Sequence, residues 1–187
     1  NKKDIPRAHI IREKGTNRHD FMNRNVNKYS WVDIGSSFLP SSLQAAFLYD
    51  QLINGFVIND KRKAIFKRYH AFFSKIIKYY NIRIPVLSEY NEFNGHFYWI
   101  KVPKGSRAKF IATARLNYIE LTSHFEPLHD SKAGQIYGKS YVDLSITKSL
   151  ANQIVRIPIH TQMSFSVQKN AIKALEKTIL ECFKTIN

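Results

Sequence analysis

Cysteine is almost missing from this sequence. Cys182 is the one cysteine among 187 residues, so the chain cannot build an internal disulfide framework. That usage is typical of a reducing compartment, and we expect a cytoplasmic protein. The same scarcity excludes cysteine-rich zinc sites, and the seven histidines include no His-Glu-x-x-His spacing. We therefore expect no metal site.

Long apolar runs and glycine-rich motifs are absent too. No stretch approaches the roughly 20 apolar residues that span a bilayer, and no signal-peptide pattern opens the sequence. The seven glycines are isolated, without Walker or dinucleotide-binding spacing, and no serine lies in a Gly-x-Ser-x-Gly elbow. These absences argue against a membrane protein, a P-loop enzyme and a serine hydrolase. The first residue is Asn1 rather than methionine, so we expect part of a longer protein.

Acidic residues are few. The chain has 14 Asp and Glu against 29 Lys and Arg, a formal net charge of +15. Such a surplus favours polyanionic partners, which could be nucleic acid, an anionic surface or a small phosphorylated ligand. The basic residues are dispersed, with no run of five or six and no basic terminal arm, and dispersion is more typical of a solvated surface.

What is present begins with helical patterns. Residues 4–14 predict a short helix, with Asp4 as its N-cap, Pro6 in the first turn and Gly15 after its end. Residues 16–34 are polar and predict a long ordered loop. A second helix is expected over residues 40–52, ended by Asn54-Gly55. A third follows over residues 60–80, with an apolar stripe at spacings of three and four, formed by Ile65, Tyr69, Phe72, Ile76 and Tyr80.

The rest of the chain predicts a small α/β unit. Strands are expected over residues 96–102, 118–122 and 154–159, and helices over residues 107–117, 144–153 and from Ser164 or Ser166 onward. A loop over residues 124–138 joins the second strand to the next helix. One side of the last helix is expected to face the core: Val167, Ala171, Leu175, Ile179 and Cys182.

Two neighbouring segments have the chemistry of an anion site. Residues 12–18 combine three cations with the end of a helix. Residues 35–41 place hydroxyls and backbone N–H groups just ahead of a helix, where the positive end of the helix dipole favours a phosphate. Ser37 and Ser41 could equally serve as helix caps, and the residues alone leave both interpretations open.

Read together, these segments resemble a known family. The similarity is carried by residues 10–18 (IIREKGTNR), 29–39 (YSWVDIGSSFL), 43–46 (LQAA), 94–98 (NGHFY), 124–129 (HFEPLH), 133–138 and 156–160 (RIPIH). In this order they resemble the DegT/DnrJ/EryC1/StrS aminotransferases, most closely the branch that makes dTDP-4-amino-4,6-dideoxygalactose.

The resemblance implies the C-terminal part of a fold-type-I, pyridoxal-phosphate-dependent transferase. Residues 1–55 would be the tail of the large domain, residues 56–81 a long connecting helix, and residues 82–187 a small α/β domain with a short mixed or antiparallel sheet. It also implies a homodimer, glutamate as amino donor and a dTDP-4-keto-6-deoxy sugar as acceptor, for lipopolysaccharide or surface-antigen synthesis. Neither a membrane nor nucleic acid is an expected partner.

The family's catalytic lysine lies before a Gly-Glu-Gly-Gly stretch that this sequence lacks. No lysine of the chain therefore takes the Schiff-base role, and we expect the chain to be inactive by itself. Two other hypotheses stay open. The chain could be a basic module that binds nucleic acid or anionic surfaces, or an inactive dimerising piece.

Six positions carry over from the family's motifs. Ser37 matches a position, often Asn in relatives, that reaches the cofactor phosphate of the neighbouring subunit. The resemblance makes the remaining five substrate-binding candidates: Lys14, Arg18 and Tyr29 near the nucleotide sugar, and His124 and His129 near the substrate entrance. Glu126 departs from the small or apolar residue of relatives, which leaves the contacts around these histidines open.

Overall fold

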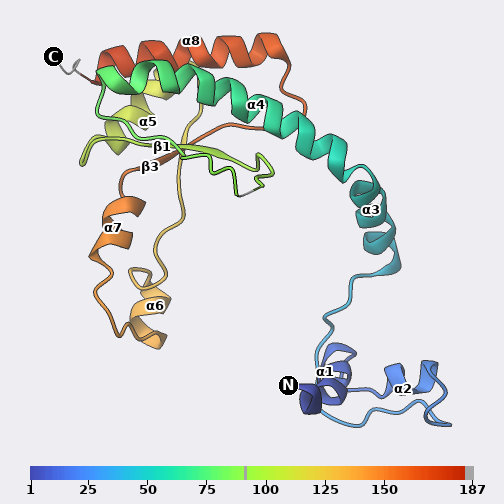
Figure 1. Cartoon of the computed structure of the whole chain (residues 1–187). Coiled ribbons are helices and arrows are strands. Elements are labelled where there is room, and N and C mark those ends of the chain that lie inside the picture. Colours follow the sequence, from blue (N-terminus) through green and yellow to red (C-terminus); the bar gives the residue numbers. More distant parts are fainter. Residues whose placement is uncertain (91, 184–187) are drawn as a thin grey trace. The chain divides into compact units, whose positions relative to one another are not determined.

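A computed structural model describes residues 1–90 and 92–183 of the chain (Figure 1). The chain divides into two compact units, Asn1–Asn54 and Gly55–Asn187. The division falls where the sequence predicts the tail of the large domain to end. The assignment of these parts to the domains of a longer enzyme stays a prediction.

The unit Asn1–Asn54 consists of short helices and loops. Its elements are η1 (Lys2–Asp4), α1 (Ile5–Arg12), α2 (Arg18–Met22) and α3 (Ser42–Ile53). The predicted first helix ends earlier than Lys14, because Lys14 and Gly15 adopt left-handed φ angles of 65° and 77°. Asp4 is the N-cap of α1, as predicted, although its side chain makes no capping hydrogen bond.

The prediction of a loop over residues 16–34 was partly wrong, because this segment contains α2. A five-residue helix lacks the repeats that produce a periodic signal, and tertiary contacts support it instead. His19 of α2 stacks on His9 of α1, with ring centroids 3.7 Å apart and the planes 6° from parallel.

The helix α3 begins at Ser42, two residues after the predicted start at residue 40, and Ser41 is its N-cap. Ser41 accepts a hydrogen bond from the N–H of Gln44, and the Gln44 side chain accepts one from the N–H of Ser41. This capping box satisfies two backbone donors at the start of the helix. Every residue of α3 is exposed, including its large apolar side chains.

The unit Gly55–Asn187 holds the sheet and its helices. Its elements are α4 (Gly55–Ile76), η2 (Ile77–Tyr79), β1 (Tyr98–Lys101), α5 (Arg107–Leu116), β2 (Thr122–Ser123), α6 (Lys132–Tyr137), α7 (Ser145–Ala151), β3 (Ile154–Ile157) and α8 (Phe165–Cys182). The predicted alternation of strands and helices is found with one addition, because the predicted loop 124–138 contains α6. Most boundaries differ from the predicted ones; among these differences, α4 begins at Gly55 rather than Asp60, and β2 is shorter and later than predicted.

The sheet is antiparallel, with strand order β1-β3-β2. Tyr98 pairs with Ile157, and Thr122 pairs with Arg156. Burial alternates along β1 and β3, so each strand turns one face to the core. The antiparallel form of the expected sheet is therefore the one found.

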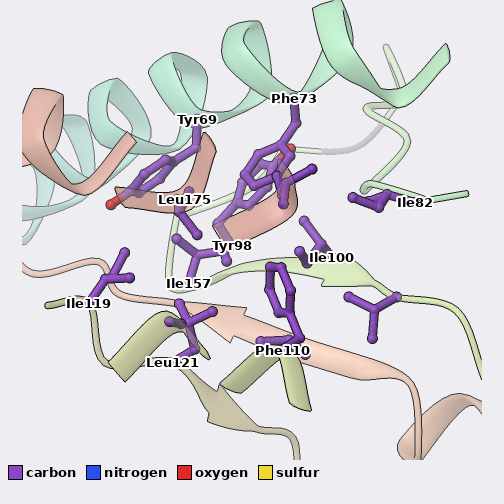
Figure 2. Close-up of a cluster of buried hydrophobic side chains, with 14 of the residues drawn as sticks. Tyr69, Phe73, Ile82, Tyr98, Ile100, Phe110, Ile119, Leu121, Ile157 and Leu175 are labelled. Carbon is purple, nitrogen blue, oxygen red and sulfur yellow. The ribbon is translucent and has the colours of Figure 1, made fainter. Parts of the chain in front are cut away.

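The core lies between this sheet and the helices of the same unit. Tyr98 is at its centre and is fully buried. Its ring stacks on Phe73 of α4 at a centroid distance of 5.5 Å and meets the edge of Phe66 at 4.8 Å. Figure 2 shows Tyr69 and Phe73 pointing from α4 toward Tyr98. A close-packed aromatic cluster of this kind contributes strongly to stability.

Two helices differ from their predicted faces. In α4 the buried residues are Ile65, Phe66, Tyr69 and Phe73, while Phe72 and Ile76 are only partly buried. Tyr80, also partly buried, lies after the end of α4. In α8, Val167 is half exposed and not a core residue. Its neighbour Gln168 is buried instead, because its side-chain amide donates to the carbonyl of Ile65 at 2.7 Å.

Candidate functional site

Two glycines join the segments that carry the predicted anion site. A Cβ on Gly15 would lie 1.7 Å from the carbonyl oxygen of Asp33, and a Cβ on Gly35 would lie 2.1 Å from the N atom of Gly15. Only glycine allows this close approach. It aligns the two segments as an antiparallel contact, with bridges between Glu13 and Ser37 and between Thr16 and Trp31.

Side chains and backbone groups lock the contact. Lys14 N–H donates to the carbonyl of Ser36 at 3.2 Å, and Ser36 N–H donates to the carbonyl of Ile11 at 2.9 Å. Asn17 holds the far end, since its side chain accepts from Ser30 N–H at 2.7 Å and donates to the Lys28 carbonyl at 3.0 Å. The end of α1 and the start of α2 are thereby fixed against residues 28–38.

A pocket of about 580 Å³ opens beside this contact; we name it the Ser37 pocket. It is lined by Arg12, Glu13, Lys14, Arg18, Tyr29, Ser37, Leu39, Pro40, Ser41, Ser42 and Gln44. Four of the six predicted site residues are among them: Lys14, Arg18, Tyr29 and Ser37. Residues up to 23 positions apart in the sequence therefore share one cavity within one unit.

The buried carboxylate of Glu13 organises the cations of this pocket. Arg12 donates to one oxygen of Glu13 at 3.1 Å and Arg18 donates to the other at 3.3 Å. Burial by itself would raise the pKa of Glu13, but the hydrogen bonds and charges of the two arginines outweigh it and lower that pKa. Glu13 is ionised near neutral pH and orients Arg18 toward the pocket.

Glu13 was missed by the sequence reasoning, which weighed the cations of residues 12–18 and passed over the acid between them. Two arginines that flank a glutamate at spacings of one and five were the available signal. Its burial depends on the Gly15–Gly35 contact, which a sequence pattern does not reveal.

Of the two serines that could act as helix caps, Ser41 does and Ser37 does not. Ser41 accepts from Gln44 N–H at the start of α3. Ser37 lies before that helix, and within residues 1–90 and 92–183 its hydroxyl forms no hydrogen bond of the protein's own. It lines the pocket and has a donor proton to give to a ligand.

The two histidines lie in the other unit and in separate pockets. His124 lines a pocket of about 260 Å³ with Arg107 and Glu126, whereas His129 lines a different one, of about 580 Å³, with Tyr141. The ring of His124 is 5.5 Å from that of Phe97, and its Nδ1 is buried without a partner in the described part of the chain. The sequence predicts that both histidines lie near one substrate entrance. In the structure they line two separate cavities.

Metal binding finds no support among the described residues, where no group of three His, Cys, Asp or Glu side chains could hold an ion. The Ser37 pocket suits a phosphate group instead, because Lys14, Arg18 and Ser37 supply cations and a hydroxyl. It suits the ring of pyridoxal phosphate less well. The ring nitrogen of that cofactor pairs with a carboxylate, and the pocket's one carboxylate, Glu13, is already held by two arginines.

Comparison with known proteins gives the family and the fold. Residues 2–176 match the model of the DegT/DnrJ/EryC1/StrS aminotransferase family. The fold is also similar to that of solved aminotransferase structures, and the sequences of three of them are 16% to 21% identical to this chain. The aminotransferase from Psychrobacter cryohalolentis has a TM-score of 0.80 at 16% identity, over 97% of this chain and 50% of that one. The aminotransferase TlmJ from Streptoalloteichus hindustanus has a TM-score of 0.77 at 18% identity, over 94% and 44%.

The third structure is a DegT DnrJ EryC1 StrS aminotransferase from Brucella abortus, with a TM-score of 0.73 at 21% identity, over 90% of this chain and 42% of that one. At these identities the likeness shows the fold. This chain spans about half or less of the length of each of these proteins. Within the described residues, no helix is long and apolar enough to cross a membrane.

Proposed function

Because the chain belongs to the DegT/DnrJ/EryC1/StrS aminotransferase family, we propose that it forms part of a transaminase acting on nucleotide sugars. The reaction moves an amino group from glutamate to C4 of a dTDP-4-keto-6-deoxy sugar, in the cytoplasm, for lipopolysaccharide or surface-antigen synthesis. The observation that carries this proposal is the gathering of Lys14, Arg18, Tyr29 and Ser37 in one pocket.

The family depends on pyridoxal phosphate, which when bound would supply the chemistry that carries the amino group. The residues of this chain would bind the cofactor phosphate and the nucleotide sugar and orient them. Ser37 would help to hold the cofactor phosphate in the active site of a partner subunit, by donating a hydrogen bond from its hydroxyl group. A hydroxyl is shorter than the amide of Asn and can still donate one hydrogen bond there.

Lys14 and Arg18 meet the pyrophosphate of the nucleotide sugar, and Tyr29 contacts its sugar region. Arg18 is the more directional of the two cations, because Glu13 fixes one of its nitrogens at 3.3 Å and leaves the rest of the planar group free to donate. His124 and His129 contribute the remaining substrate contacts from the small domain.

Binding of dTDP and of inorganic phosphate to the whole chain tests the Ser37 pocket. In NMR titrations we expect the backbone amides of residues 14–18 and 35–38 to shift. Ser37→Ala should weaken phosphate binding about ten-fold, since a hydrogen bond to a charged group is worth about 1.5–3 kcal/mol. Ser36→Ala is the matched control, because Ser36 is the next residue and does not line the pocket. Equal affinities of the two variants would refute the role of Ser37.

Arg18→Gln tests the nucleotide contact in the same way. It should weaken dTDP binding about ten-fold or more, because it removes a bidentate phosphate donor. Lys28→Gln, an exposed charge in the same loop, is the control and should leave the affinity within about two-fold.

The purified chain mixed with pyridoxal phosphate tests the expectation that it is inactive by itself. We expect neither the absorbance of lysine-bound cofactor nor turnover of a dTDP-4-keto sugar with glutamate. If both appear, a lysine of this chain performs the chemistry and the proposed division of roles is wrong.

Self-association is part of the same proposal, because α3 exposes a row of apolar side chains. Leu43 is 82% exposed, Phe47 72% and Leu52 66%. Exposed apolar surface of this kind is typical of a protein interface. We expect the chain to form dimers or larger species in light scattering, and Leu43→Gln with Phe47→Gln to shift it toward the monomer. A wild-type chain that stays monomeric at high concentration would contradict this.

A further inference from the structure

Three cations gather at the edge of the sheet, in the unit Gly55–Asn187. Arg83 and Lys101 lie directly opposite each other in an antiparallel bridge, and each donates its backbone N–H to the carbonyl of the other, at 3.0 and 2.8 Å. Lys104 follows on the next turn. A pocket of about 260 Å³ lies there; we name it the Arg83 pocket, and it is lined by Asn81, Arg83, Lys101, Val102, Pro103, Lys104 and Gln153.

The positively charged side chains of Arg83, Lys101 and Lys104 repel one another. Like charges directly opposite each other on neighbouring strands destabilise a sheet. No acidic residue lines the pocket. Among residues 1–90 and 92–183, neither Arg83, Lys101 nor Lys104 takes part in an ion pair. No carboxylate in the pocket lining offsets this repulsion. An anion bound between the three side chains would offset it.

The turn beside the pocket adds positive potential. Ser106 lies at the N-cap position of α5, yet its hydroxyl donates to the carbonyl of Pro103 at 2.6 Å, and in the described structure no side chain caps this helix. The uncapped N–H groups of a ten-residue helix thus lie three residues beyond Lys104. Their partial charge favours an anion in the same region.

The volume and the lining residues of the Arg83 pocket indicate which kind of anion it would bind. A volume of about 260 Å³ lies just under the 300–1,000 Å³ typical of sites for drug-sized ligands. Lysine and arginine only donate hydrogen bonds, and a phosphate presents several acceptor oxygens to them. We propose that Arg83, Lys101 and Lys104 bind the phosphate or diphosphate group of a small phosphorylated molecule. None of these residues lines the Ser37 pocket, so this inference is independent of the proposed function.

Titration of the whole chain with inorganic pyrophosphate, followed by NMR, tests the proposal. We expect saturable shifts of the amides of residues 101–107, separate from those of residues 14–18 and 35–38 that report on the Ser37 pocket. Arg83→Gln with Lys101→Gln should weaken the binding reported by residues 101–107 at least ten-fold. It should leave the curve reported by the Ser37 pocket unchanged.

The control variant removes the same two charges elsewhere. Lys169→Gln with Lys173→Gln changes exposed positions of α8 that line no pocket described above, and should alter the affinity less than two-fold. Lys104→Gln lies on an exposed turn, so it tests the site even if the double substitution in the sheet disturbs folding; we expect about three-fold weaker binding. The proposal is overturned if residues 101–107 show no saturable shift, if the control weakens binding as much as the site variants do, or if only a DNA duplex shifts these amides.

Discussion

The two units of this chain use their apolar residues in opposite ways. All the buried hydrophobic side chains of the described core belong to residues 65–179, whereas none of η1, α1, α2 and α3 buries a residue. Residues 1–54 are ordered by backbone hydrogen bonds, ion pairs and glycine contacts. Their apolar side chains, led by those of α3, remain exposed.

The comparison explains where stability and function reside. A core of close-packed apolar and aromatic side chains supplies free energy of folding within residues 55–183. The polar contacts of residues 1–54 contribute less to stability, and they position charged groups around a cavity. A surface that keeps its apolar side chains exposed gains stability when another surface covers it.

Matched phenylalanines give the largest expected difference. Phe73→Ala empties a fully buried position and should lower the free energy of unfolding of the second unit by about 3–5 kcal/mol. Phe47→Ala removes a side chain that is 72% exposed and should change the free energy of unfolding of the first unit by less than about 0.5 kcal/mol. Urea unfolding measures both, with Trp99 fluorescence in a Trp31→Phe background for Phe73→Ala and Trp31 fluorescence in a Trp99→Phe background for Phe47→Ala. Similar losses from the two variants would abolish the contrast.

Matched glycines come next. Gly15→Ala places a Cβ 1.7 Å from a backbone oxygen and should cost residues 1–54 about 3 kcal/mol or more. Gly105 also has a left-handed φ, 82°, but a Cβ there meets nothing within 4 Å, so Gly105→Ala should cost only about 1–2 kcal/mol. Trp31 fluorescence in a Trp99→Phe background reports on the first unit. A fully native signal from Gly15→Ala would show that the contact can rearrange.

Acid should affect the two units in sequence. Burial lowers the pKa of His70, whose Nδ1 forms a hydrogen bond with the hydroxyl of Tyr98 at 3.4 Å. The neutral form is therefore favoured in the folded state. The stability it contributes is present above the unfolded pKa of about 6.5 and is lost as the pH falls through the lowered folded pKa.

Glu13 behaves the same way at lower pH. Its lowered pKa contributes stability that is present above the unfolded value of about 4.3 and is lost as the pH falls through the lowered value. Unfolding at several pH values, read separately from Trp99 and Trp31, should show the second unit weakening first. His70→Asn should flatten the dependence read from Trp99, and Glu13→Gln that read from Trp31. Identical pH profiles for the two reporters would contradict this assignment.

The smallest effect lies within the well-packed unit. Tyr118 has a φ of 61° and is 99% exposed, at the position after α5 where Tyr118 N–H donates to Arg115 and Ile119 N–H to Ala114. Helices that end this way usually carry glycine there. Tyr118→Gly should raise the free energy of unfolding by about 1 kcal/mol, measured by thermal unfolding. A loss of stability would mean that the tyrosine ring makes contacts worth more than the strain.

The candidate site could be found from the sequence only in part. Lys14, Arg18, Tyr29 and Ser37 were found through a family resemblance, and on residue chemistry alone Ser37 was as good a helix cap as a phosphate ligand. The structure shows Ser41 to be the cap. Glu13 could not be found in this way, because a carboxylate becomes an organising group only once folding has buried it.

The sequence by itself determined the family and, apart from α6, the order of strands and helices in the second unit. Each of these rests on local signals: periodicity, capping residues and motifs read along the chain. Only the tertiary structure decided that Gly15 and Gly35 pack together, that Glu13 binds two arginines, that His124 and His129 line different pockets, and that Arg83 is opposite Lys101. These are contacts between residues distant in the sequence, and they form only when the backbone brings them within a few ångströms.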